Sequence, residues 1–256
     1  MSEHFNMKNL FLIFLLISCS AVPKKPNQTI VLIQGVHVDG GVWTELKKSF
    51  KESGFNIMDL NRIGRDSEDP ASLGKIAGMS CQQIPQKSIL VAHSYGGAIA
   101  NQMTGLCPEK VSRIIYVSAI VPLKNEKPFD LMNKTDQRNY SRVVTFGKFK
   151  IVPKDALTYF KGTDPLIKSD HKLPDLHSEW ISLISEDLNY DENLFQGIPK
   201  SYIYTKNDPV LSLTTQFQYT SRTKIKDVTG IATGHYPMVS NPKKLSEIIF
   251  KIVNKN

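Results

Sequence analysis

The sequence lacks several features that would assign it to a common class of protein. Its longest uninterrupted apolar run, residues 10–17, is shorter than the roughly 20 residues that a membrane-spanning helix needs. It has no internal repeat, no group of residues at metal-ligand spacing, and no recognition helix or aromatic platform for RNA. We therefore expect neither a repeat protein nor a bound metal or other cofactor.

The composition is that of an ordinary globular protein. Of 256 residues, 41% are hydrophobic and 22% are charged, which favours one domain with an insertion. Lys and Arg outnumber Asp and Glu by 32 to 24, a formal net charge of +8. These basic residues are spread along the chain and form no stripe, so we expect a generally basic surface and no nucleic-acid partner.

The N-terminal sequence has the pattern of a segment that directs export. Lys8 precedes the apolar run, and small residues follow it, which is typical of a secretory signal peptide. The end of the run, Leu-Ile-Ser-Cys, resembles the bacterial lipobox, in which Cys19 is lipidated. We expect a signal peptide over 1–19, a Pro-rich tether over 20–28, and a bacterial cell-envelope protein with a lipid anchor at Cys19. The alternatives are a soluble secreted or periplasmic protein, a buried helix, or an unprocessed anchor.

Export affects the reading of the two other cysteines, Cys81 and Cys107. An oxidising compartment permits a disulfide bond. Each of the two closes an expected helix, and in a right-handed α/β layer both fall at the same end of neighbouring helices. Two alternatives stay open here: a disulfide between Cys81 and Cys107, or two small buried thiols.

The rest of the chain alternates between two hydrophobic patterns. Short β-branched runs indicate strands and helical spacing indicates helices; the expected strands are 30–33, 55–60, 88–92, 111–118, 201–205 and 224–228, and the expected helices 42–52, 73–83, 95–106, 211–221 and 243–253. This alternation predicts an α/β fold with a mostly parallel, doubly wound sheet. Residues 123–198 do not continue this alternation of strands and helices, so we interpret them as a cap inserted into a core of residues 29–122 and 199–256.

The strongest local motif is Val-Ala-His-Ser-Tyr-Gly-Gly, which places Ser94 between a buried strand and a helix. This is the arrangement of a nucleophile elbow, a tight turn that needs small residues two positions on either side of the serine. Ala92 and Gly96 meet that need. The helix N-terminus that follows favours negative charge developing at the serine oxygen. We predict that Ser94 is a nucleophile and that His93 is structural.

A serine hydroxyl needs a base, and the base needs an acid that orients it. His235 lies in a Gly- and Pro-bounded loop after the last expected strand, and Asp208 follows the strand that ends at Thr205. The order Ser, Asp, His, each after a strand, is the order of a hydrolase triad. Asp191 and Asp227 are alternative acids with poorer placement.

The oxyanion hole needs two backbone N–H donors. Tyr95, directly after the serine, supplies one, and we expect Val36, in the loop after the first strand, to supply the other. Gly35 lets that backbone turn. We also assign Gly35 and His37 as substrate-binding residues.

With these pieces placed, the chain from Thr29 onward resembles the α/β-hydrolase superfamily, in particular the compact group of methyl-ester esterases, hydroxynitrile lyases and their bacterial relatives. The matching segments are IVLIQGVHVDGGVW, VAHSYGG, YTKNDPV and TGHYPMVSNP. Where the group usually begins its first loop with His-Gly, this chain has Gln34 and Gly35, which puts a loop hydrogen bond in doubt. The lyases carry a threonine at the place of Gly35 and a lysine at the place of Tyr236, so the resemblance implies hydrolysis.

We therefore expect a serine hydrolase, resembling carboxylesterases, that cleaves a small ester-type substrate through an acyl-enzyme. The alternatives are a small-molecule-binding protein that does no catalysis on a hydrolase fold, or a lyase or carbon–carbon hydrolase of the same superfamily. We expect a monomer or a dimer. Aromatic and aliphatic residues of the cap either line the pocket or form the cap's own core; the candidates are Phe129, Leu131, Phe160 and Trp180.

Overall fold

The computed structural model describes residues 28–168 and 170–255. The expected signal peptide over 1–19, with its Cys19, and all of the tether except Gln28 lie outside the described residues. Within the described ranges, no helix combines the length and the apolarity that crossing a bilayer requires.

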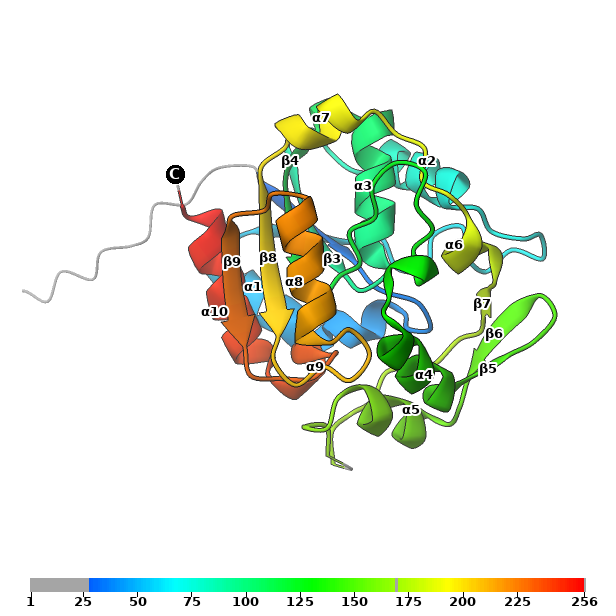
Figure 1. The fold of residues 1–256 in the computed structure, drawn as a ribbon. Coiled ribbons are helices and arrows are strands. Elements are labelled where there is room, and N and C mark those ends of the chain that lie inside the picture. The colour runs from blue at the N-terminus through cyan, green and yellow to red at the C-terminus, as the bar shows by residue number, and fades with distance from the viewer. Residues whose placement is uncertain (1–27, 169, 256) are drawn as a thin grey trace, which may run out of the picture.

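A six-stranded sheet in the order β2-β1-β3-β4-β8-β9 forms the centre of the fold (Figure 1). Every neighbouring pair in it is parallel. The strands are β1 (Thr29–Ile33), β2 (Asn56–Asp59), β3 (Ser88–His93), β4 (Val111–Val117), β8 (Lys200–Thr205) and β9 (Asp227–Ile231). The predicted parallel α/β sheet is confirmed.

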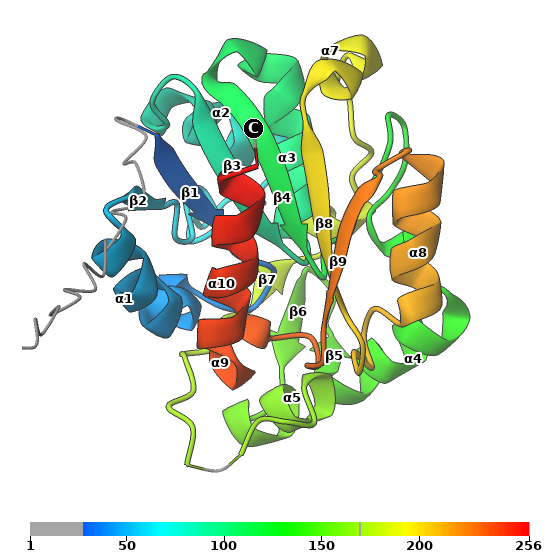
Figure 2. The same ribbon diagram turned by 90° about the vertical axis from the view of Figure 1, so that its left-hand side faces the viewer.

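Helices cover both faces of this sheet, which explains the unbroken apolar runs in the sequence. Figure 2 shows α10 (Pro242–Val253) in front of the strands, beside α1 (Thr44–Ser53). On the opposite face lie α2 (Leu73–Gln83), α3 (Gly96–Leu106) and α8 (Leu213–Arg222). Because it is enclosed on both sides, β3 is buried at all of its positions.

One strand was predicted in the wrong place. The expected strand 224–228 is β9, which begins three residues later, at Asp227, and continues to Ile231. Lys224 has a positive φ of 57°, and the N–H of Ile225 donates to the carbonyl of Thr220. These two residues therefore finish the turn after α8, and pairing with β8 starts only where Asp227 lies opposite Ser201.

The segment between β4 and β8 contains more regular structure than its sequence pattern indicated. It forms η3 (Phe129–Leu131), α4 (Lys134–Val143), α5 (Ala156–Thr163), α6 (Ser182–Ser185), α7 (Glu192–Gly197) and a small antiparallel sheet of β5 (Val144–Phe146), β6 (Lys150–Pro153) and β7 (Glu179–Trp180). In Figure 2, α4, α5, β5 and β6 lie beyond the arrowheads of the central strands. These four elements thus lie over the carboxyl edge of the sheet, where ligands of such folds bind, while α7 lies at the opposite end, where β8 begins.

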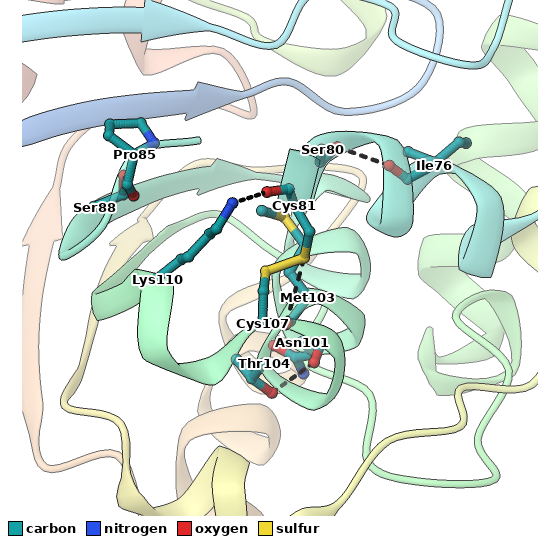
Figure 3. The surroundings of a disulfide bond; sticks show 10 residues. All are labelled: Ile76, Ser80, Cys81, Pro85, Ser88, Asn101, Met103, Thr104, Cys107 and Lys110. Carbon is teal, nitrogen blue, oxygen red and sulfur yellow. Dashed lines mark hydrogen bonds between the residues drawn. A yellow bond between two sulfur atoms is a disulfide. The ribbon is translucent and has the colours of Figure 1, made fainter. Parts of the chain in front are cut away.

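A disulfide bond joins the two helices that flank β3. Cys81 in α2 and Cys107, directly after α3, are linked with a Cα–Cα distance of 6.0 Å (Figure 3). Beside the bond, the Lys110 ammonium donates to the carbonyl of Cys81 at 2.7 Å. The bond therefore fixes the far end of α3, the helix whose N-terminus follows Ser94.

Removing this bond should lower stability without altering the residues at the carboxyl edge of the sheet. The cysteines are 26 residues apart, so loop-closure entropy predicts a loss of roughly 3 to 4 kcal/mol in the free energy of unfolding for a Cys81→Ala, Cys107→Ala double variant. Urea unfolding of both proteins at pH 7 measures the difference. Reactive thiols at both Cys81 and Cys107 in the denatured, unreduced parent protein would contradict the bond itself.

Candidate active site

Ser94 lies on a strained turn between β3 and α3. Its φ of 53° is in the left-handed region that few residues other than glycine adopt, as a nucleophile elbow requires. Gly96 makes the turn possible, because a Cβ there would lie 2.4 Å from the carbonyl oxygen of Ile33. The turn directs the Ser94 hydroxyl to the carboxyl edge of the sheet.

The structure brings Ser94, His235 and Asp208 together in one chain of hydrogen bonds. His235 Nε2 lies 2.9 Å from Ser94 Oγ, and His235 Nδ1 lies 2.7 Å from Asp208 Oδ2. All three residues are buried. With Nδ1–H donating to the carboxylate, Nε2 is left to accept the proton of the serine hydroxyl, which is the proton transfer that a serine nucleophile requires.

Asp208 is surrounded by donors that keep it ionised. Besides His235, the N–H groups of Val210 and Leu211 donate to its Oδ1, each at 2.8 Å, and the hydroxyls of Thr205 and Ser118 donate to its Oδ2. Burial by itself would raise the pKa of Asp208, but the neighbouring His235 and these hydrogen bonds hold it below its usual range. The charged carboxylate can then stabilise an imidazolium at His235.

A second serine, Ser118, also contacts the imidazole but from the wrong side for nucleophilic attack. Its hydroxyl lies 3.1 Å from His235 Nδ1 and donates to Asp208, whereas Ser94 lies at Nε2. Ser118 therefore supports the acid. The sequence interpretation missed this residue, although its position directly after β4, on the carboxyl edge of the sheet, was a signal.

The alternative acids lie elsewhere. Asp191 is exposed and caps α7 through the N–H of Asn193. Asp227 lies at the start of β9, at the opposite edge of the sheet, where it accepts from Ser201 Oγ and Lys255 Nζ. Neither contacts His235, so the geometry selects Asp208.

Val36 and Tyr95, the two residues predicted to supply oxyanion N–H donors, line the same cavity as Ser94. Within residues 28–168 and 170–255, no acceptor is hydrogen-bonded to the N–H of Val36 or of Tyr95. The loop that carries Val36 touches the elbow at Gly35, where a Cβ would come within 2.7 Å of Ser94 Cβ. Gly35 therefore allows the loop to approach the nucleophile, so its contribution is close packing.

The cavity beside Ser94 is apolar and small. It has a volume of about 30 Å³. Its walls come from the core and from the segment between β4 and β8: Val36, Ser94, Tyr95, Ile120, Phe129, Met132, Tyr140, Tyr159, Ile184, Val210, Leu211 and His235. A larger hollow of about 400 Å³ lies around Asp39 and His171 and contains none of the three hydrogen-bonded residues, so we assign the chemistry to the smaller cavity.

The structure does not support His37 as a substrate-binding residue, because its side chain does not line the cavity. Both ring nitrogens have protein partners: Nδ1 lies 3.0 Å from the carbonyl of His177 and Nε2 lies 2.6 Å from the hydroxyl of Tyr140. Tyr140 lines the cavity and His37 lies behind it. Of the four expected wall residues, Phe129 lines the cavity, while Phe160 packs on Tyr236. The other two, Leu131 and Trp180, pack against the hydrophobic core.

The loop that carries His235 is held by a buried aspartate that the sequence interpretation missed. The carboxylate of Asp164, after α5, accepts from the N–H groups of Gly234 and Tyr236 and from the hydroxyl of Ser240. The N–H of His235 itself donates to the carbonyl of Thr163 at 3.0 Å. The segment between β4 and β8 therefore positions the base as well as covering it.

Two other buried histidines should make stability fall with acid. Burial lowers the pKa of His37 to about 4 and that of His93 to about 3, both from 6.5. Below pH 6.5 the unfolded chain thus binds more protons than the folded one. The free energy of unfolding is therefore highest above that pH, and it decreases as the pH falls toward the pKa values that the two histidines have in the folded state. Together they should remove about 5 kcal/mol from the free energy of unfolding between pH 7 and pH 4.5.

Urea unfolding at pH 7.0, 5.5 and 4.5 measures this loss. A His93→Asn variant should retain only about half of the pH dependence, because one of the two groups is gone. The same free energy of unfolding at pH 7.0 and 4.5 in the parent protein would show that these histidines take up protons in the folded state.

Comparison with known proteins agrees with this geometry. A sequence profile described as "Alpha/beta hydrolase family" matches residues 30–248. Methylesterase 7 of Arabidopsis thaliana is 22% identical, with 91% of this chain and 98% of the relative aligned. Norfluorocurarine synthase 2 of a Strychnos species is 23% identical, with 91% and 97% aligned. The solved structure of a pyrethroid hydrolase from Sphingobium faniae matches with a TM-score of 0.75 at 18% identity, covering 89% of this chain and 97% of that one.

Proposed function

We propose that this chain, which belongs to the α/β-hydrolase family, is a carboxylic ester hydrolase that works through an acyl-enzyme on Ser94. An enzyme of esterase type is what its relatives support. The observation that carries the finer proposal is the unbroken chain of hydrogen bonds from Ser94 through His235 to Asp208.

The chemistry follows from these contacts. Ser94 Oγ attacks the ester carbonyl carbon while its proton passes to His235 Nε2. The carbonyl oxygen becomes an oxyanion that accepts from the N–H groups of Val36 and Tyr95. When the tetrahedral intermediate collapses, the imidazolium returns the proton to the departing alkoxide. Water, deprotonated by His235, then attacks the acyl-enzyme and releases the acid and Ser94.

The lining and the volume of the cavity favour a neutral substrate whose acyl group is small. Apart from His235, its lining residues carry no ionisable acid or base but tyrosine, and burial raises the pKa of Tyr159, which keeps its hydroxyl neutral. A volume of about 30 Å³ holds only a few water molecules, each of which needs roughly 10–15 Å³. A long acyl chain would have to displace Phe129, Met132 or Tyr140.

A panel of p-nitrophenyl esters tests this proposal. We expect kcat/KM for the acetate to exceed that for the octanoate by about 5- to 150-fold, because overpacking a closed apolar site costs about 1–3 kcal/mol. A fluorophosphonate probe should label one serine per chain. No hydrolysis and no labelling would favour a binding protein on this fold, and labelling without ester hydrolysis would favour lyase or carbon–carbon chemistry. Tyr236, in place of a lysine after His235, argues against the lyase.

We further propose that residues 123–198 act as the cap and that the chain is exported and anchored through lipidated Cys19. The lipobox-like sequence and the disulfide between Cys81 and Cys107 support export, since such bonds persist in oxidising compartments. Metabolic labelling with a radioactive fatty acid in a bacterial host tests the anchor. Label in the parent chain and none in a Cys19→Ala variant is expected; equal label in both would overturn it.

A further inference from the structure

We propose that Arg65 is a positioning residue for the oxyanion hole. It holds the peptide between Gly35 and Val36 so that the Val36 N–H faces the reacting carbonyl, and its charge makes that N–H a stronger donor. The inference rests on the proposed function, because an oxyanion hole has a role only if Ser94 attacks a carbonyl.

Arg65 is buried behind the loop that follows β1. Its exposed fraction is 3%, and it lies after β2, far from Ser94 in the sequence. Its Nη1 donates to the carbonyl of Gly35 at 2.7 Å and its Nη2 to the carbonyl of Gln34 at 3.1 Å. No other donor reaches the Gly35 carbonyl among the residues that the structure describes.

The geometry of a trans peptide links this contact to the active site. The carbonyl of Gly35 and the N–H of Val36 belong to the same planar unit, and no peptide bond of the described chain is cis. In a trans peptide these two groups point in opposite directions. Arg65, by binding the carbonyl on one side of the loop, therefore fixes the direction of the Val36 N–H on the other side. Val36 and Ser94 line the same cavity.

The charge of Arg65 adds to this orientation. A hydrogen bond from a charged donor polarises the peptide that accepts it, and linked hydrogen bonds strengthen one another by roughly 10–30% each. The Val36 N–H is thus a better donor than that of an isolated peptide. It is prepared before the substrate arrives, which is the property that stabilises an oxyanion most effectively.

The next peptide of the loop, between Val36 and His37, is held by Glu179, a buried carboxylate that also contacts Arg65. Glu179 of β7 accepts from the N–H of His37 at 3.1 Å and from Arg62 at 2.7 Å, and it lies 3.5 Å from Arg65. The peptides on both sides of the Val36 α-carbon are therefore held by charged side chains. Glu179 comes from the segment between β4 and β8, so this segment supports the oxyanion loop as well as the base.

Two variants and a matched control test the role of Arg65. Arg65→Met should lower kcat by about 10- to 100-fold and leave KM within about 3-fold, since the oxyanion forms only after the substrate is bound. Arg65→Lys, which cannot span both carbonyls, should lose less. The control is Arg113→Met, because Arg113 is a partly buried arginine that donates to Ser201 at the opposite edge of the sheet; it should leave kcat unchanged.

A boronic acid inhibitor supplies a readout that a merely structural role would not move. It forms a tetrahedral adduct on Ser94 that mimics the oxyanion. Across the parent, Arg65→Lys and Arg65→Met, the inhibition constant should rise in proportion to the fall in kcat/KM. A folded Arg65→Met enzyme with kcat and boronate affinity within about two-fold of the parent would overturn the inference while the esterase proposal stands.

Other outcomes are also decisive. If Arg65→Met does not fold, the comparison passes to Arg65→Lys, and a variant that loses thermal stability but keeps kcat and boronate affinity again overturns the role. If the parent protein itself neither hydrolyses esters nor takes up the fluorophosphonate or the boronate, the proposed function fails first, and the positioning role fails with it.

Discussion

Ser94→Ala should reduce ester hydrolysis by about 10⁶-fold, to the level of the uncatalysed reaction plus what binding alone contributes. The reason is that Ser94 Oγ is the atom that bonds to the carbonyl, and no other hydroxyl lies at His235 Nε2 among the described residues. Labelling by the fluorophosphonate should disappear. The measurements are kcat/KM on p-nitrophenyl acetate and the mass of the labelled protein.

Ser118→Ala is the matched control, because Ser118 is the other serine that contacts the imidazole. Its hydroxyl meets Nδ1 and Asp208, so its loss removes one of the donors to the acid and leaves the nucleophile in place. We expect a decrease in kcat of about ten-fold, the value of one hydrogen bond, and complete labelling. Full loss of labelling in Ser118→Ala with retention in Ser94→Ala would reverse the two assignments and refute the mechanism.

Asp208→Asn should lower kcat by about 10⁴-fold with little change in KM. An asparagine in this position presents an amide that cannot accept from all the groups now bound to the carboxylate, and where it donates to His235 Nδ1 it forces the proton onto Nε2. The imidazole then cannot accept from Ser94. The substitution also removes the negative charge that stabilises the imidazolium.

The buried position makes a stability measurement necessary beside the kinetics. Asp208 accepts from two backbone N–H groups that its replacement would partly leave unpaired, so the melting temperature of the variant should be recorded. Asp191→Asn is the control, since Asp191 is exposed and caps α7; its activity should equal that of the parent. A folded Asp208→Asn enzyme with kcat within ten-fold of the parent would exclude Asp208 as the acid.

These predictions depend on different kinds of information. Ser94 and His235 could be assigned from the sequence because the elbow is local: tight turns and helix N-termini are made by neighbouring residues, and the buried strands around them are continuous apolar runs. The acid was less certain because any carboxylate on a loop after a strand is eligible. Only the fold showed that Asp191 and Asp227 lie away from His235 and that Asp208 meets its Nδ1.

The segment between β4 and β8 was the least predictable part. α4 is mostly polar, and its helical pattern is carried by a few buried positions such as Tyr140 and Val143. Its functional residues gave no motif. Asp164 and Glu179 are single carboxylates in a region rich in charge. They differ from the other carboxylates there because they are buried and accept hydrogen bonds from backbone N–H groups, and both properties depend on chain segments far away in the sequence.

The sequence by itself therefore predicted the parallel α/β architecture and the serine and histidine of the proposed triad, because hydrophobic periodicity and turn chemistry act over a few residues. Tertiary structure alone decided which carboxylate contacts His235, which residues line the cavity and that Arg65 holds the loop after β1. Those features depend on distances between residues that are remote along the chain, and a hydrogen bond of 2.7 Å such as that from Arg65 to Gly35 exists only once the sheet and the segment above it have packed together.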